Sequence, residues 1–369
     1  MLKSFLKFVF KTLYRVEVKR LDNYKAAGKR IVIVANHLSF LDGLLLALFL
    51  PGRPMFAIDS KIATQWYVKP FSKLVRLFPL DSTSPMATKA MIREIRKDRQ
   101  CVIFPEGRIT ITGSLMKVYE GPGMIADKAD ARILPVRIEG AQYTPFSRLK
   151  GKVRLRWFPK ITLSMLPPQK FEIPEEIKGR RRRTAAGLKL YDLMCEMLFD
   201  SSNLKQTIFS SVLDQKHIHG RKHLVAEDPM RDPINYGDLI TRSFILGDKI
   251  AKVTGGREGE FVGLMLPNMV TSVITFFALQ AYGRVPAMLN FSTGAQNLLA
   301  VCRGAEIQTV ITSKQFINTA KLSPLTDALE EQGINIVYLE DVGKTVTAFD
   351  KIRGLVASYI PETTYKRIW

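Results

Sequence analysis

The sequence is poor in the residues that build disulfide and metal sites. Its 369 residues include three cysteines, Cys101, Cys195 and Cys302, which are widely spaced and form no C-x-x-C pair. This pattern argues against a disulfide framework and favours a reducing, cytosolic environment. Three of the four histidines crowd into residues 217–223, a segment without a carboxylate or thiolate to complete a ligand set. We therefore interpret that segment as solvated and expect no metal site.

Long apolar runs are also missing. No stretch reaches the roughly 18–20 consecutive apolar residues of a membrane-spanning helix. The nearest candidate, residues 261–291, is interrupted by Pro267, Asn268 and Gly283, so we expect a buried strand, a turn and a helix there. Residues 1–18 have no uninterrupted apolar core and no small-residue cleavage site, so we do not interpret them as a secretory signal.

Acidic residues are scarce in the first half of the chain. The net charge is +21 at pH 7, and residues 1–200 carry 37 Lys and Arg against 18 Asp and Glu, whereas the remainder carries 18 against 16. Such an asymmetry indicates that the basic half meets something anionic. Nucleic acid, an anionic membrane and an acidic carrier protein all satisfy the charge alone.

The first 18 residues have the pattern of a basic amphipathic helix. A cation recurs every four positions, and phenylalanine and leucine fall between the cations, which are Lys3, Lys7, Lys11 and Arg15. Aromatic side chains opposite a cationic stripe suit the boundary between headgroups and acyl chains, so the pattern favours a membrane surface. A terminal helix that packs on its own domain, with solvated lysines, stays open as the alternative.

A histidine and an aspartate follow the strongest strand pattern in the chain. The β-branched run over residues 31–35 predicts a strand, and it is followed by His37, Asp42 and an apolar helix pattern. A histidine of near-neutral pKa can take a proton from a hydroxyl while a carboxylate orients its ring. The two side chains meet only if His37 precedes the helix and Asp42 lies in its first turn. Ser39 supports this arrangement, because S-x-x-D has the form of a capping box; in the alternative, Asp42 only caps backbone amides.

A second polar tip follows a second strand pattern. Residues 100–104 are apolar and are followed by Pro105, Glu106, Gly107 and Arg108. Glycine permits close approach of the backbone to a ligand, and arginine presents a fork that suits phosphate. The alternative is a tight surface turn with an incidental ion pair. Two strand ends with polar tips predict one pocket at the carboxyl edge of a sheet.

Further patterns extend this into an α/β domain over residues 1–200. The spacing predicts helices over residues 66–77 and 84–99, and it predicts strands over residues 55–58, 132–138, 152–157 and 161–164. Residues 201–235 are polar and punctuated by histidine, aspartate and proline, so they are predicted to be a linker. Residues 236–369 are then predicted to belong to a second domain.

The two polar tips resemble motifs of the glycerolipid acyltransferase family, which includes the lysophosphatidic acid acyltransferases. Asn36-His-Leu-Ser-Phe-Leu-Asp42 is similar to its H-x-x-x-x-D signature, and Phe104-Pro-Glu-Gly-Arg108 is similar to its second hallmark. The resemblance implies a mixed sheet flanked by helices, with an N-terminal amphipathic helix. It also implies that His37 is the general base and Asp42 its orienting carboxylate, and that Glu106, Gly107 and Arg108 bind the acceptor's phosphate. Many members have a threonine between Gly107 and Arg108, so its absence points to a subgroup.

The second domain resembles the beginning of the adenylate-forming synthetases. The resemblance rests on Tyr236-Gly-Asp-Leu239, Gly263-Leu-Met-Leu-Pro-Asn268 and residues 283–290. The order of the two domains is similar to the bacterial family of bifunctional 2-acylglycerophosphoethanolamine acyltransferases and acyl-carrier-protein synthetases. The Ser/Thr/Gly-rich loop that ends in lysine and holds the ATP phosphates is missing, so we expect an incomplete synthetase domain that does not activate fatty acids.

These resemblances imply an O-acyltransferase of phospholipid remodelling at the cytoplasmic face of a bacterial inner membrane. The acyl chain would pass from a thioester, with acyl carrier protein as donor, to a lysophospholipid, with 2-acylglycerophosphoethanolamine as acceptor. This step needs no cofactor, whereas ATP and magnesium belong to the complete synthetase domain. No G-x-S-x-G elbow is present, so direct attack by an activated hydroxyl is favoured over a covalent acyl-enzyme.

Two other functions remain open. One is a lysophosphatidic acid acyltransferase that uses acyl-CoA or acyl carrier protein. The other is a non-catalytic module that binds a membrane surface. Nucleic acid ranks last among the anionic partners, because aromatic base-stacking motifs are missing from the basic half.

Overall fold

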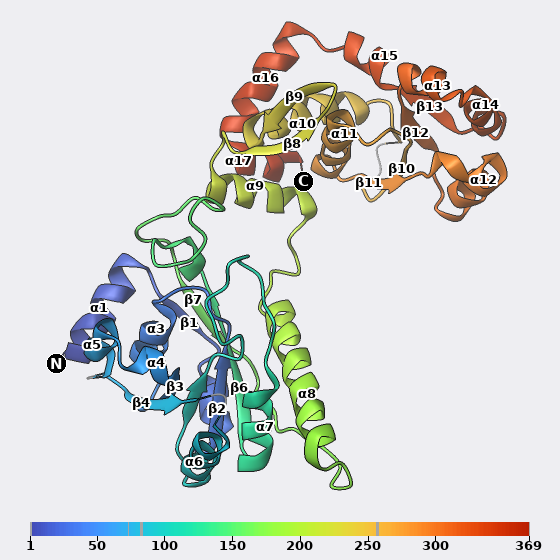
Figure 1. The fold of residues 1–369 in the computed structure, drawn as a ribbon. Coiled ribbons are helices and arrows are strands. Elements are labelled where there is room, and N and C mark those ends of the chain that lie inside the picture. The colour runs from blue at the N-terminus through green and yellow to red at the C-terminus, as the bar shows by residue number, and fades with distance from the viewer. Residues whose placement is uncertain (1, 73, 82–83, 256–257, 369) are drawn as a thin grey trace. The chain divides into compact units, whose positions relative to one another are not determined.

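The chain divides into two compact units, Met1–Asn203 and Leu204–Trp369. The structure is a computed structural model that describes residues 2–72, 74–81, 84–255 and 258–368 (Figure 1). In unit 1 the sheet has the strand order β1-β7-β6-β2-β5-β3-β4. Neighbouring strands are parallel except β6 and β7, which are antiparallel, so the expected α/β class with a mixed sheet is confirmed. The strands are β1 (Glu17–Lys19), β2 (Ile31–Ala35), β3 (Met55–Asp59), β4 (Arg76–Leu80), β5 (Cys101–Ile103), β6 (Arg132–Glu139) and β7 (Thr162–Met165).

Helices cover both faces of this sheet (Figure 1). Ile31, Ile33 and Ala35 of β2 belong to the core that includes α1, α2 and α3, whereas Val32 and Val34 belong to the core that includes α6, α7 and α8. Because side chains alternate along a strand, burial on both faces explains the unbroken apolar run of β2. The helices are α1 (Leu2–Leu13), α2 (Asp22–Ala27), α3 (Asp42–Phe49), α4 (Ser60–Ala63), η1 (Trp66–Val68), α5 (Lys69–Ser72), α6 (Pro85–Arg96), α7 (Glu120–Ala129), η2 (Ala141–Tyr143) and α8 (Gly179–Asp200).

Two of the predicted elements of unit 1 are wrong. Residues 152–157 form no strand, although cations and other residues alternate there as along a strand. Residues 66–77 do not form one helix, because the helical part ends at Ser72 and β4 begins at Arg76. Pro79 lies inside β4 without breaking it, since β4 is the edge strand of the sheet and its outer N–H groups have no partner strand. The helix predicted over residues 84–99 is present as α6.

The N-terminal helix α1 packs on its own domain, as one of the two arrangements left open by its sequence predicts. Phe10 is buried in the core of unit 1, and Leu6 packs against that core. Leu2, Phe5 and Phe8 are nevertheless exposed. The helix therefore docks on its own unit and still presents apolar side chains to its surroundings. None of the helices in the described parts of the chain is both long and apolar enough to cross a bilayer.

Unit 2 contains a parallel sheet with the strand order β11-β10-β12-β13 and a separate hairpin of β8 and β9. The strand, turn and helix expected in residues 261–291 are present as β10, α11 and β11. Its strands are β8 (Leu224–Asp228), β9 (Arg231–Asn235), β10 (Phe261–Leu264), β11 (Val285–Met288), β12 (Thr309–Thr312) and β13 (Asn335–Tyr338). Its helices are α9 (Ile208–His219), α10 (Tyr236–Ile250), α11 (Val270–Ala281), η3 (Phe291–Thr293), α12 (Ala295–Gly304), α13 (Lys314–Ala320), α14 (Ser323–Glu331), α15 (Leu339–Lys344), α16 (Ala348–Tyr359) and α17 (Pro361–Ile368).

The segment expected to be a linker, residues 201–235, is mostly folded into unit 2. It contains α9, β8 and β9, and Phe209 and Ile234 from these elements are buried in the core that α10 and α11 share. The polar composition of the segment led to the prediction of a linker. A few buried apolar side chains are nevertheless enough to anchor a short helix and a hairpin.

Candidate active site

The structure brings His37 and Asp42 together at the end of β2. His37 lies in the turn that follows the strand, and Asp42 is the first residue of α3. The Nδ1 atom of His37 lies 2.8 Å from Oδ2 of Asp42. The side chain of Asp42 is fully buried, whereas the His37 side chain is 20% exposed. The pair thus has a buried carboxylate on one side and an open imidazole edge on the other.

Asp42 also accepts hydrogen bonds from the turn in front of α3. Its Oδ2 accepts the backbone N–H groups of Leu38 and of Ser39, the latter at 2.8 Å. The Ser39 hydroxyl donates to Oδ1 at 2.9 Å and accepts the N–H of Leu41. Ser39 therefore does not cap the helix in the expected way, because Asp42 itself begins the helix and accepts a hydrogen bond from the Ser39 hydroxyl. Backbone capping and contact with His37 are both present.

This environment selects one tautomer of His37. Because Asp42 acts as an acceptor for every other group that it contacts, Nδ1 carries the proton that it shares with the carboxylate. Nε2 is then left as an acceptor. A ring in this state can accept a proton at Nε2 while the carboxylate stabilises the resulting imidazolium.

Glu106 is buried and holds two segments of backbone. Its Oε1 accepts the N–H of His37 at 2.8 Å, and its Oε2 accepts the N–H of Met116 at 2.8 Å. Burial raises the pKa of the Glu106 carboxyl, although both hydrogen bonds act in the opposite direction. With both oxygens engaged and a side chain that is almost inaccessible, Glu106 positions the His37 turn and has no free oxygen for a ligand.

Gly107 and Arg108 lie at the surface beside this anchor. Gly107 has φ +64°, and a Cβ there would lie 3.3 Å from Cε2 of Tyr119, so the turn requires glycine. Arg108 is exposed, and its side chain forms neither a hydrogen bond nor an ion pair with any residue that the structure describes. Of the three residues in this motif, Arg108 is the one whose side chain is available to a ligand.

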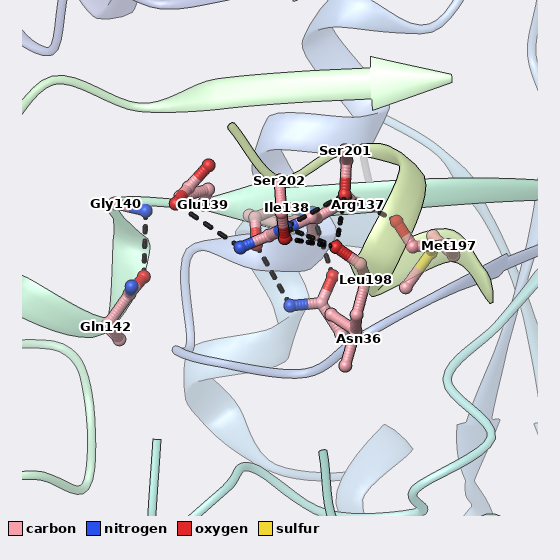
Figure 2. Close-up of polar contacts among 10 residues, drawn as sticks. All are labelled: Asn36, Arg137, Ile138, Glu139, Gly140, Gln142, Met197, Leu198, Ser201 and Ser202. Carbon is pink, nitrogen blue, oxygen red and sulfur yellow. Dashed lines mark hydrogen bonds and ion pairs between the residues drawn. The ribbon is translucent and has the colours of Figure 1, made fainter. Parts of the chain in front are cut away.

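Two further contacts hold His37 and a third holds its neighbour Asn36, and the sequence analysis predicted none of the three. The Phe104 ring stacks on the imidazole with a centroid distance of 4.2 Å. The Thr110 N–H donates to the carbonyl oxygen of His37 at 2.8 Å. The Asn36 amide donates to the Ile138 carbonyl oxygen and accepts the Ile138 N–H, as Figure 2 shows. Only the position of Phe104 and Asn36 inside the two motifs could have indicated such roles.

Arg137 fixes the strand to which Asn36 is bound. Its guanidinium donates to the carbonyl oxygen of Leu198 and to the Ser201 hydroxyl, both at 2.9 Å (Figure 2). These bonds join β6 to the end of α8. The backbone around His37 is thereby tied to an element on the other face of the sheet.

The described parts of the chain contain no cluster of three or more histidine, cysteine, aspartate or glutamate side chains arranged to hold a metal. Of the five predicted site residues, His37 and Asp42 are in contact, Glu106 is buried, and Gly107 and Arg108 are exposed.

Two family models match the chain in succession. Residues 15–139 match the model described as acyltransferase, and residues 216–354 match the model described as AMP-binding enzyme. The first match contains His37, Asp42 and the whole of the Glu106–Arg108 motif. Unit 1 thus contains the region that matches the acyltransferase model, and unit 2 contains the region that matches the AMP-binding model.

The chain is also similar to solved structures, at low identity and low TM-scores. The chain is similar to the crystal structure of the 1-acyl-sn-glycerophosphate (LPA) acyltransferase PlsC from Thermotoga maritima, with 18% identity and a TM-score of 0.37 over 53% of this chain and 81% of that one. It is similar to a benzoate CoA ligase from Burkholderia xenovorans LB400, with 16% identity and a TM-score of 0.33 over 38% of this chain and 29% of that one. It is also similar to the anthranilate CoA ligase AuaEII in complex with anthranoyl-AMP, with 18% identity and a TM-score of 0.34 over 42% of this chain and 28% of that one. The chain therefore spans less than a third of either ligase.

Proposed function

We propose that unit 1 transfers an acyl chain from a thioester to the free hydroxyl of a lysophospholipid. The observation that carries this proposal is the 2.8 Å contact between His37 and Asp42 within the region that matches the acyltransferase model. A buried carboxylate beside a partly exposed imidazole is the arrangement that general-base catalysis of acyl transfer requires.

The reaction follows from the tautomer of His37. Nε2 accepts the proton of the acceptor hydroxyl as the hydroxyl oxygen attacks the thioester carbonyl carbon, and Asp42 stabilises the imidazolium. The tetrahedral intermediate collapses when the C–S bond breaks, and the imidazolium proton passes to the departing thiolate. The products are an ester and a free thiol, and His37 returns to its starting state. The thioester supplies the leaving group, so this step uses no metal and no nucleotide.

Arg108 would bind the phosphate of the acceptor. It is exposed, cationic and two residues away from Thr110, whose N–H contacts the backbone of His37. A guanidinium presents paired donors that fit phosphate oxygens. Glu106 contributes by holding the His37 turn, and Gly107 permits the tight backbone between these two side chains.

We assign 2-acylglycerophosphoethanolamine as the acceptor and acyl carrier protein as the donor, at the cytoplasmic face of a bacterial inner membrane. The order of an acyltransferase domain and an AMP-binding domain supports this assignment, since it couples acyl transfer to a domain of the acyl-activating type. The exposed apolar side chains of α1 support a membrane surface as the place of reaction.

A product analysis tests the substrate assignment. Purified chain is incubated with an equimolar mixture of lysophospholipids and with acyl-carrier-protein or acyl-CoA thioesters, and the lipid products are identified by mass spectrometry. Diacyl phosphatidylethanolamine from the carrier-protein donor is the expected product. Phosphatidic acid as the main product would instead establish the lysophosphatidic acid alternative, and vesicle binding without any product would establish a non-catalytic membrane module.

Unit 2 is not proposed to activate fatty acids in this chain. The printed sequence has no Ser/Thr/Gly-rich loop ending in lysine, which adenylate-forming enzymes use to hold the ATP phosphates. ATP–pyrophosphate exchange that depends on fatty acid is therefore expected to be absent from the purified chain, and measurable exchange would overturn this assignment.

A further inference from the structure

The connection between β6 and β7 contains an unusual concentration of exposed cations. Residues 140–171 include no aspartate or glutamate. Five cations occupy every second position of the part that we call the basic loop, residues 146–158, and all five are exposed: Arg148, Lys150, Lys152, Arg154 and Arg156. Leu149 is buried and Val153 and Leu155 are partly covered, so the loop turns its charged side chains outward.

None of these five cations forms an ion pair with a carboxylate among the residues that the structure describes. Nearby Lys160, in contrast, is paired with Glu17. Five like charges close together repel one another, so electrostatic attraction to an external anionic surface is favourable for the loop.

Aromatic side chains are exposed in the same loop. Phe146, Trp157 and Phe158 have 40%, 67% and 47% of their surface accessible. Soluble surfaces carry isolated apolar residues, but here three large rings accompany five cations within 13 consecutive residues. Rings that sit at the boundary of headgroups and acyl chains, with cations at the phosphate level, are the composition of an interfacial membrane-binding segment.

The basic loop lies directly against the turn that carries His37. The N–H of Phe40 donates to the carbonyl oxygen of Phe146 at 3.1 Å, and the Arg148 guanidinium lies 5.7 Å from the centre of the Phe40 ring. Phe40 is 58% exposed and stands three residues after His37. Lys152 donates to the carbonyl oxygen of Ile111, in the loop that follows Arg108, at 2.6 Å. The loop therefore touches both segments of the candidate active site.

The other end of the basic loop is joined to the end of α1. Arg15 donates to the carbonyl oxygen of Phe158 at 2.9 Å, and the Tyr14 ring meets the Phe158 ring edge-on with centroids 5.4 Å apart. These contacts connect the loop to the element whose Phe5 and Phe8 are exposed. The basic loop is thus continuous with a helix that already has an amphipathic membrane-binding pattern.

We propose that the basic loop is a second membrane-docking surface, which binds anionic phospholipid headgroups through its five cations and inserts Trp157 and Phe146 at the bilayer interface. Docking through this loop turns the His37 side of unit 1 toward the membrane, where a lysophospholipid acceptor resides. The catalytic use of this orientation rests on the proposed acyltransferase function, whereas the binding of the loop to a membrane does not.

The aromatic rings favour a bilayer over an acidic carrier protein as the partner. Binding of an acidic carrier protein would explain the cations, but it would not explain why Trp157 is exposed among them. A bilayer accounts for both features, because rings and alkyl stems enter the interface while charged heads remain with the phosphates.

Vesicle co-sedimentation of the full chain tests the proposal. The double variant Lys150→Gln/Arg154→Gln removes two exposed cations that have no ion-pair partner in the described parts of unit 1. Arg180→Gln/Arg181→Gln removes two exposed cations from α8 and is the matched control. Each cation near an anionic surface contributes about 1 kcal/mol, or roughly fivefold in partitioning. We expect about a 10- to 30-fold loss of binding to phosphatidylcholine vesicles containing phosphatidylglycerol for the loop variant, and less than about a threefold loss for the control.

Quenching by brominated acyl chains tests the insertion of Trp157. Trp157→Phe is expected to lose most of the vesicle-dependent quenching of the chain's tryptophan fluorescence. Equal loss of binding in the two double variants, or quenching unchanged in Trp157→Phe, would overturn the proposal. A loop variant that binds vesicles normally but loses transfer only from acyl carrier protein would overturn it in favour of an acidic carrier.

The same assay separates this proposal from the proposed function. His37→Ala is expected to bind vesicles like the wild-type chain, because His37 lies outside the basic loop. Normal binding by His37→Ala together with unimpaired acyl transfer would refute the catalytic role and leave the docking surface standing.

Discussion

The imidazole Nδ1 of His37 and the carboxylate Oδ2 of Asp42 are 2.8 Å apart, although one residue precedes helix α3 and the other begins it. Had both belonged to one regular helix, five positions would have placed their side chains about 140° apart. The turn between β2 and α3 therefore brings the two side chains into contact. Its shape is held by the hydrogen bonds of Ser39, Leu38 and Glu106.

Asp42→Asn tests the orienting carboxylate. The amide keeps the size of the side chain, but its NH₂ group cannot accept the proton of Nδ1 or the N–H groups of the turn, so the wrong tautomer is favoured. We expect kcat for acyl transfer to fall by about 10³–10⁴-fold, as for other histidine–carboxylate pairs. Asp22→Asn, at an exposed position of α2, is the matched control and is expected to retain full activity. Activity of Asp42→Asn within about tenfold of wild type would contradict the role.

Glu106→Gln tests the buried anchor. Glutamine can accept only one of the N–H groups of His37 and Met116, so one buried donor loses its partner at a cost of about 1–3 kcal/mol. Urea unfolding should show this destabilisation of unit 1, together with lower acyl transfer. Glu176→Gln, an exposed position, is the control and should change neither quantity.

The stability difference between wild type and Glu106→Gln should depend on pH. Burial raises the pKa of Glu106 in the native state, so ionisation of this carboxyl costs the folded protein free energy. Wild type therefore loses that part of its stability as the pH rises through the native pKa, whereas the glutamine variant does not. Unfolding measured from about pH 4 to pH 7 should show a narrowing difference, and a widening one would contradict the direction of the shift.

Gly107→Ala tests the tight turn between Glu106 and Arg108. A left-handed φ costs a residue with a Cβ about 1–2 kcal/mol, and the new methyl group would press on Tyr119. We expect a destabilisation of that size and reduced transfer. Gly304→Ala, in α12 where a Cβ meets no atom within 4 Å, should be neutral or slightly stabilising.

Arg108→Ala tests the phosphate site. A charge-assisted hydrogen bond to phosphate contributes about 1.5–3 kcal/mol, so KM for the lysophospholipid should rise about 10- to 100-fold. Stability should not change, since the side chain has no partner within the described part of the chain. Arg181→Ala is the matched control. An unchanged KM in Arg108→Ala would remove Arg108 from the acceptor site.

The sequence predicted the central strands and the two polar tips because both depend on local patterns. An unbroken apolar run such as residues 31–35 marks a strand that is covered on both faces, and the polar residues that follow it stand at the edge of the sheet. The pairing of His37 with Asp42 could also be predicted, since the two residues are only five positions apart in the sequence.

Contacts between distant segments could not be predicted in this way. The bond from Glu106 to Met116 needs a loop that returns to the site, and the bond from Asn36 to Ile138 needs the neighbouring strand. The alternation of cations within residues 152–157 led to a wrong strand prediction. Side chains that alternate in exposure fit a strand, but the pattern does not supply a partner strand. In the structure the alternating cations are instead exposed in the basic loop.

The most direct test of the account is acyl transfer by purified His37→Gln, measured with an acyl-carrier-protein thioester and lysophosphatidylethanolamine in vesicles. Thermal unfolding and vesicle binding, measured alongside, show whether the variant is folded and docked. The account predicts that a folded, membrane-bound variant loses acyl transfer by about 10³-fold or more. Transfer at the wild-type rate would contradict the proposal that His37 is the general base.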